Sequence, residues 1–332
     1  MESSRLMELL SHRIQLAHLP TPIQFMPRIS DLLGVRLYIK RDDLTESIAS
    51  GNKIRKLEYL MADALKSGAD TVVSYGGIQS NHCRAVAWAA AKLGLSCVLA
   101  LRGDAPDHWD GNLLLDHLLG ADVRFFPKAL FNDPDQLDSN LMREIRNAGK
   151  APYSIPIGGS NATGTLGYVH MVGELADSGV RFDHLYHALG SGGTYAGMWL
   201  GCRLHAIESR VHGIAVCDDI GYFMTELARI RLDFQKKYQM DVDFSGADQL
   251  MDDRYVGIGY ALNTGTELNE LVRFARLEGL VLDPVYTLKA FLGMVDHIRT
   301  GIVSPGQTVL FIHTGGHAGL FPKHAEFEKL MV

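Results

Sequence analysis

The sequence predicts an α/β protein of two domains, each an open twisted parallel sheet with flanking helices. Short apolar runs typical of buried strands alternate with segments whose apolar residues recur at helical spacing. That alternation indicates parallel strands joined by crossover helices. The chain has 332 residues, 47% of them hydrophobic, which is enough for two cores. Glycine-rich turns follow several of the expected strands, so a ligand is expected in the cleft between the two units.

In the first half of the chain, an extended segment and a strand precede a regular series of helices and strands. Prolines extend residues 19–23, and the alternation of Val35, Leu37 and Ile39 predicts a strand. A helix is expected to begin near Lys53, because apolar residues follow it at helical spacing. Further strands are expected at residues 71–74, 96–101, 123–126 and 153–157, with helices at 81–93 and 112–118 and another that starts after 131–135.

The second half of the chain repeats the pattern. Helices are expected at residues 162–176 and 195–204, strands at 184–189 and 211–216, and a last buried strand at 309–312 that stops in a turn. The sequence contains no internal repeat and no low-complexity linker. Two α/β units with interleaved ends are therefore expected.

The composition narrows the class of protein. Charged residues make up 21% of the chain and the net charge is only -6, so neither nucleic acid nor a membrane surface is an expected partner. The longest apolar runs, at 85–91 and 95–101, are too short to span a bilayer. The first residues lack the apolar core of a signal peptide, so the cytoplasm is the expected location. The cysteines lack the spacing of a zinc site and fit a reducing compartment: Cys83, Cys97, Cys202 and Cys217.

Two lysines stand out at the start of the helix near residue 53. Lys53 and Lys56 lie three residues apart on one face, beside a helix N-terminus that already favours negative charge. They indicate a site for an anionic ligand. Lys53 follows the glycine turn at Gly51, and a lysine held in this way can lose its proton and form a Schiff base with an aldehyde. Solvated surface lysines explain the same segment, and on this segment alone they are the better explanation.

Two glycine-containing loops each precede a helix. Residues 76–82 place Ser80 and Asn81 at a helix N-terminus, where they suit a carboxylate or serve only as a helix cap. Residues 190–195 offer backbone N–H groups to a phosphate. This second loop lacks the third glycine of a dinucleotide fingerprint, because Tyr195 stands there, which weighs against a nicotinamide oxidoreductase. A third loop, 158–164, is expected to shape the cleft.

Segments 40–43 and 51–58 together resemble the signature of the pyridoxal-phosphate enzymes that include D-cysteine desulfhydrase and 1-aminocyclopropane-1-carboxylate deaminase. The resemblance returns at four more places and covers almost the whole chain. It implies the fold of the tryptophan synthase β-subunit (fold type II), with a small domain of residues 51–160 inserted in a large domain of residues 1–50 and 161–332. It also implies a homodimer.

The resemblance assigns functional residues as well. It implies that Lys53 carries pyridoxal 5'-phosphate and that the cofactor is also bound by Lys56, Asn81, Ser191, Gly192, Gly193, Thr194, Thr287 and Thr314. The expected substrate contacts are Ser80, Asn81 and His82, and the expected catalytic residues are Lys53, Ser80, Tyr260 and Tyr286. His82 is either a proton carrier or a positioning donor. No metal is expected.

The subfamily is indicated by two threonines. The deaminases carry an acidic residue at the position of Thr287 and an aliphatic one at Thr314, whereas the D-cysteine enzymes carry hydroxyls. The resemblance therefore implies a β-eliminating lyase that converts D-cysteine to pyruvate, hydrogen sulfide and ammonia. The alternatives are the cyclopropane deaminase, a lyase for another β-substituted amino acid such as L-cysteate or D-serine derivatives, and a protein that binds the cofactor without turnover.

Overall fold

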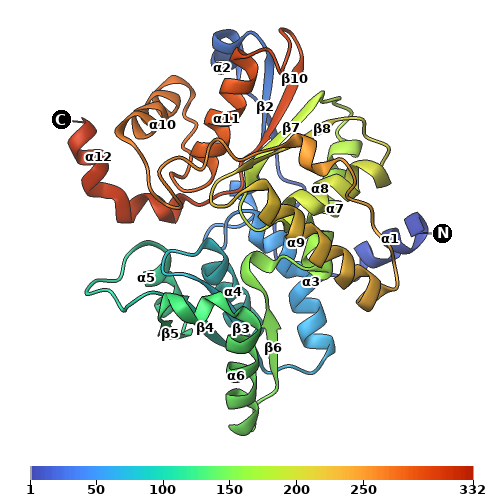
Figure 1. Ribbon diagram of the computed structural model, residues 1–332, viewed down its shortest axis with the longest axis vertical. Helices are drawn as coiled ribbons and strands as arrows, with labels where there is room; N and C mark the ends of the chain where they lie inside the picture. The colour runs from blue at the N-terminus through green and yellow to red at the C-terminus, as the bar shows by residue number, and fades with distance from the viewer. Residues whose placement is uncertain (1, 332) are drawn as a thin grey trace.

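The computed structural model describes residues 2–331, and these form two separate sheets (Figure 1). The larger sheet has six strands in the order β1-β2-β10-β7-β8-β9, and the smaller has four in the order β5-β4-β3-β6. β1 runs antiparallel to β2, and the other recorded pairings are parallel. The predicted fold class, parallel sheets with flanking helices, is confirmed.

The six-stranded sheet has a hydrophobic core on each face. Its strands are β1 (Ile23–Phe25), β2 (Arg36–Lys40), β7 (His184–Leu189), β8 (Arg210–Ala215), β9 (Met251–Asp252) and β10 (Thr308–Ile312). Leu310 and Ile312 of β10 pack in one core, whereas Val309 and Phe311 pack in another, as the alternation of side chains along a strand requires. The first core includes α7 (Ala162–Asp177), α8 (Gly193–Leu204) and α9 (Ile220–Asp233); the second includes α2 (Pro27–Leu33), α10 (Gly265–Glu278) and α11 (Thr287–Arg299).

The four-stranded sheet lies in the lower part of Figure 1. Its strands are β3 (Thr71–Gly77), β4 (Ser96–Arg102), β5 (Asp122–Phe126) and β6 (Pro152–Ile155). One core beside it includes α3 (Asn52–Lys66), α4 (Asn81–Leu93) and α5 (Gly111–Leu118), and the other includes α6 (Pro134–Asn147). We propose that these strands mark the small domain expected at residues 51–160, because all four fall within that range.

The remaining elements are short or terminal. They are α1 (Glu2–Ser11), η1 (Asp42–Leu44), η2 (Lys128–Asn132), η3 (Ile157–Gly159), the π-helix η4 (Phe234–Tyr238), η5 (Ala247–Leu250), η6 (His317–Lys323) and α12 (His324–Met331). β3 is longer than predicted, because the pairing with β4 continues through Gly76 and Gly77. Within residues 2–331, none of the helices combines the length and the apolar character needed to cross a membrane.

A buried network of charges fixes α3 between the two sheets. The Arg55 guanidinium contacts Asp42 Oδ1 at 2.8 Å and Glu174 Oε1 at 2.7 Å, and Lys40 Nζ contacts Glu174 Oε2 at 2.6 Å. These side chains are at most 8% exposed, and Tyr168 also donates to Asp42. Because each buried charge has a partner, the network is satisfied, and the loss of one member would leave another charge uncompensated. These ion pairs therefore hold the first turns of α3 in place relative to its neighbours.

Candidate active site

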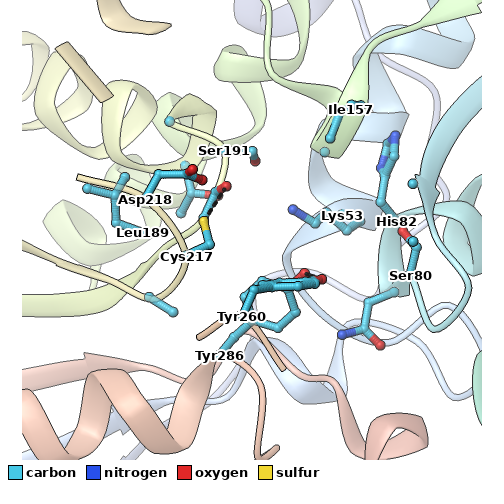
Figure 2. A pocket seen from close by; sticks show the side chains of 18 of the residues that line it. Lys53, Ser80, His82, Ile157, Leu189, Ser191, Cys217, Asp218, Tyr260 and Tyr286 are labelled. Carbon is cyan, nitrogen blue, oxygen red and sulfur yellow. Dashed lines mark hydrogen bonds between the residues drawn. The ribbon is translucent and has the colours of Figure 1, made fainter. Parts of the chain in front are cut away.

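A cavity of about 710 Å³ lies between the two sheets and is lined by loops from both (Figure 2). Residues that follow β3, β4, β7, β8 and β10 contribute to its wall, which places the cavity at the carboxyl ends of parallel strands. Its contents are chemically mixed: an amine, hydroxyls, amides, a thiol and a carboxylate meet on an apolar background. Such a concave site with convergent polar groups is typical of small-molecule binding.

Lys53 projects its amine into this cavity from the first turn of α3 (Figure 2). The preceding Gly51 has a φ of 113°, and a Cβ there would lie 2.4 Å from the carbonyl oxygen of Thr314. Only glycine therefore allows α3 to begin so close to the end of β10, where Asn52 N donates to the same oxygen. Burial lowers the pKa of Lys53 to about 8. A larger fraction of its amine is unprotonated at neutral pH than for an exposed lysine.

Lys56 lies behind the cavity wall. Its Nζ donates to the Gly158 carbonyl oxygen at 3.0 Å and lies 3.4 Å from Ser160 Oγ, and the side chain is fully buried. Burial lowers the pKa of Lys56 well below its usual value, and the nearby Lys53 lowers it further. Within residues 2–331, the wall of the cavity does not include Lys56. The expected contact of Lys56 with a phosphate stays a prediction. Any effect of Lys56 on a phosphate would be transmitted through the segment 158–160, which its amine contacts.

Ser80 and Asn81 line the cavity at the N-terminus of α4. The Ser80 hydroxyl accepts from Cys83 N at 3.2 Å, so it is the helix cap and also part of the wall. The amide oxygen of Asn81 accepts from Asn112 Nδ2 at 3.1 Å. Cys83 itself is fully buried in the core below.

His82 is a neutral side chain in the wall. Its Nε2 lies 3.0 Å from Ser74 Oγ, which in turn donates to the Ile155 carbonyl oxygen. The Ser74 hydroxyl therefore accepts from His82 Nε2–H, and Nδ1 is the unprotonated nitrogen. Burial lowers the pKa of His82 well below its usual value, and the charges of Lys53 and Lys56 add to this effect. This favours a positioning role over that of a cationic proton carrier.

The turn between β7 and α8 supplies Gly190, Ser191, Gly192 and Thr194 to the wall, whereas Gly193 packs against Ser160. A Cβ on Gly158 would lie 2.3 Å from Ser191 Oγ and 3.4 Å from Lys53 Nζ. Glycine there keeps open the space between the lysine and the turn. A helix N-terminus with free N–H groups beyond that space suits a phosphate. The amine and the turn together fit an aldehyde that carries a phosphate group.

Tyr260 and Tyr286 meet in the cavity with their hydroxyl oxygens 2.5 Å apart (Figure 2). The buried Asp283 holds the turn before α11, since its carboxylate accepts from the backbone N–H groups of Val285 and Tyr286 at 2.9 Å. Burial raises the pKa of both phenols. They therefore enter the site as protonated hydrogen-bond donors, not as phenols activated by a neighbouring positive charge.

The two threonines that are expected to distinguish the subfamilies lie in different surroundings. Thr314, at the end of β10, is part of the cavity wall. Thr287 is fully buried at the start of α11, and its hydroxyl lies 2.8 Å from Asp283 Oδ1 and 2.7 Å from Asp283 N. Among the described residues, Thr287 is not part of the wall. Its expected contact with the cofactor stays a prediction.

Several residues of the wall were not singled out from the sequence. Cys217 and Asp218 follow β8, Tyr222 lies in α9, Arg102 ends β4, and Lys128 follows β5. The signal that could have found most of them is their place just after predicted parallel strands, where the loops of such sheets converge. None of them belongs to a recognisable short motif.

Comparisons with known proteins agree with this geometry. Residues 14–315 match the family described as pyridoxal-phosphate dependent enzyme. The chain is 40% identical to the mitochondrial bifunctional D-cysteine desulfhydrase/1-aminocyclopropane-1-carboxylate deaminase of Arabidopsis thaliana over 99% of this chain and 84% of that protein. It is 41% identical to a putative 1-aminocyclopropane-1-carboxylate deaminase of Pyrococcus abyssi over 96% of each.

Solved structures of related proteins are similar to this chain as well. One described as an ACC deaminase homologue has a TM-score of 0.87 and 40% identity, over 98% of this chain and 99% of that one. Threonine deaminase isoform 2 from Solanum lycopersicum has a TM-score of 0.67 at 16% identity, over 98% of this chain and 87% of that one. The second similarity shows the fold alone.

Proposed function

The chain belongs to the pyridoxal-phosphate-dependent enzymes, in the group that contains 1-aminocyclopropane-1-carboxylate deaminases and D-cysteine desulfhydrases, and from this premise we propose that it is a β-eliminating lyase for D-cysteine. The products would be pyruvate, hydrogen sulfide and ammonia. The Arabidopsis relative is named as an enzyme with both activities, so its name does not favour one of them. The choice between them for this chain depends on its own residues.

The observation that carries the proposal lies at the end of β10, where the cavity wall presents the Thr314 hydroxyl, whereas the carboxylate of the wall, Asp218, comes from the segment after β8. Asp283, the nearby acid, is fully buried and accepts from three backbone N–H groups and the Thr287 hydroxyl. A carboxylate favours a protonated cofactor ring and a stronger electron sink, whereas a hydroxyl serves an unprotonated ring. Elimination of a thiol from the neighbouring carbon needs the weaker sink, and opening of a cyclopropane needs the stronger one.

Different residues of the cavity have different roles in the proposed reaction. When bound, pyridoxal phosphate supplies the electron sink for the bond broken at the substrate α-carbon. Lys53 Nζ would hold the cofactor aldehyde, and its amine is the base that would take the α-proton. Ser80 and Asn81, at the N-terminus of α4, bind the substrate carboxylate. The paired hydroxyls of Tyr260 and Tyr286 donate a proton toward the departing sulfur.

The proposal is tested with the purified enzyme. Sulfide and pyruvate are followed from D-cysteine and L-cysteine, beside ammonia and 2-oxobutanoate from 1-aminocyclopropane-1-carboxylate. We expect sulfide from D-cysteine, no 2-oxobutanoate, and loss of turnover in Lys53→Ala with the fold retained. A visible cofactor band without product from any of the three substrates would contradict the substrate assignment, and a fully active Lys53→Ala variant would contradict the role of the lysine.

A second candidate substrate class is favoured by the charges at the edge of the cavity. Arg102 and Lys128 are exposed cations of the wall, and a cationic rim suits a β-substituent that leaves as an anion, such as the sulfonate of L-cysteate. Arg102 lines the same cavity as Tyr260, and its charge opposes the rise that burial causes in the pKa of that phenol. Sulfite release from L-cysteate that exceeds sulfide release from D-cysteine would favour this class.

A further inference from the structure

We propose that Asn112, a residue of α5 behind the cavity wall, positions the side-chain amide of Asn81 so that its NH₂ group faces the bound ligand. Asn112 is fully buried, and it is not part of the wall formed by the described residues. The proposal concerns the site described above and rests on the proposed function only for the identity of the substrate. Asn112 acts through another residue and does not touch the ligand itself.

The hydrogen bonds of Asn112 fix which end of its amide faces which partner. Its Oδ1 accepts from Arg84 Nη1 at 2.9 Å, and its Nδ2 donates to the Gln79 carbonyl oxygen at 3.0 Å and to Asn81 Oδ1 at 3.1 Å. A guanidinium can only donate and a carbonyl oxygen can only accept, so the amide of Asn112 cannot be reversed without two mismatched contacts. Its backbone N–H also donates to Gln79 Oε1 at 2.8 Å.

This arrangement determines the orientation of Asn81. Because Asn112 presents a donor, Asn81 must turn its Oδ1 toward Asn112 and its Nδ2 away. Asn81 lines the cavity, and a Cβ on Gly316 would lie 2.7 Å from Asp283 Cγ and 3.1 Å from Asn81 Nδ2, so glycine at that position leaves room for both side chains. Asn81 therefore meets a ligand as a donor, which suits a carboxylate or a phenolic ring oxygen.

Arg84 connects this amide to the lysine segment. Besides Asn112, the guanidinium donates through Nη2 to the carbonyl oxygen of Ser50 at 2.9 Å, immediately before Gly51 and the start of α3. Arg84 is 2% exposed, and burial lowers the pKa of its guanidinium to about 10. A single buried cation thus fixes the start of the Lys53 helix and, through Asn112, the amide of Asn81.

The test is Asn112→Asp. The aspartate has the same size and still accepts from Arg84, but it can no longer donate to the Gln79 carbonyl oxygen or to Asn81, whose amide would rotate and present its oxygen to the ligand. We expect the dissociation constant for pyridoxal phosphate, titrated into cofactor-free protein, to rise about tenfold. The KM for D-cysteine should rise by about the same factor. A tenfold rise corresponds to the loss of one charge-assisted hydrogen bond. The lost bond to Gln79 should lower the melting temperature of the cofactor-free protein, so both constants are measured well below it, where a purely structural role would leave them unchanged.

The matched control is Asn140→Asp on the exposed face of α6, where Asn140 Oδ1 also accepts from an arginine, Arg143 Nη2, at 2.9 Å. It should change neither constant. If Asn112→Asp does not fold, Asn112→Ser removes the same donor and should raise the dissociation constant by a smaller factor. Unchanged constants in a folded Asn112 variant, or an equal change in the control, would overturn the proposal. Wild-type protein that binds the cofactor but releases no sulfide would contradict only the proposed substrate.

Discussion

Replacement of Lys53 by methionine should stabilise the cofactor-free protein at neutral pH. The cavity holds an amine whose pKa burial lowers from 10.5 to about 8. Between these values the unfolded chain binds a proton that the native protein does not, so the stability of the wild type rises with pH across this window. Below pH 8 the native protein carries the full cost of a buried cation. Methionine has a similar length and no charge, so it removes that cost.

The magnitude follows from the two pKa values. At about 1.4 kcal/mol for each pH unit between them, the buried amine costs about 3 kcal/mol of unfolding free energy at pH 7 and about 1.4 kcal/mol at pH 9.5. The Lys53→Met variant should exceed the wild type by these amounts. Urea denaturation of both cofactor-free proteins at the two pH values measures the difference.

The control is Lys66→Met at the exposed end of the same helix, which should give no such gain at pH 7. A Lys53→Met variant that is no more stable than the wild type at pH 7 would refute the reasoning about the buried amine. If the difference in unfolding free energy between the variant and the wild type increased from pH 7 to pH 9.5, the predicted direction of the pH dependence would be wrong.

Three further outcomes are expected. Gly158→Ala places a methyl group 2.3 Å from Ser191 Oγ at a φ of 66°, so the dissociation constant for pyridoxal phosphate in a spectroscopic titration should rise roughly tenfold. Tyr286→Phe removes the partner 2.5 Å from the Tyr260 hydroxyl and should lower kcat for sulfide release by about 10² or more, with cofactor affinity retained; wild-type turnover would exclude this phenol from proton transfer. Thr264→Ala breaks the capping box of α10 and should cost about 1 kcal/mol in urea denaturation without a change in kcat, and a loss of activity instead would show that α10 acts on the site.

Local patterns predicted most of the elements that carry the site. The helix that starts beside Lys53, the helix that opens at Asn81 and the strand 184–189 lie where the apolar spacing placed them. The reason is that the apolar residues of a buried face recur in the sequence with the period of the helix or strand. The Ser80 cap could be predicted in the same way, because a cap is a contact within one turn.

The faces that meet across the cavity could not be predicted from spacing. Lys56 repeats the helical position of Lys53 but points at the carbonyl oxygen of Gly158, and Thr287 follows Tyr286 but turns to Asp283. Cys217 lies in no motif, yet it follows β8 and joins the same cavity wall as Lys53.

The sequence by itself determined the elements, the glycine turns and, through its resemblance to a known family, the cofactor, whereas the role of Lys53 stays a prediction. Only the tertiary structure decided which polar groups line the cavity and which, like Asn112 and Asp283, form hydrogen bonds to them from behind the wall. The physical reason is that periodicity encodes the burial of one element against its neighbours, whereas a site depends on how two sheets, each with its own core, place the ends of their strands around a common space.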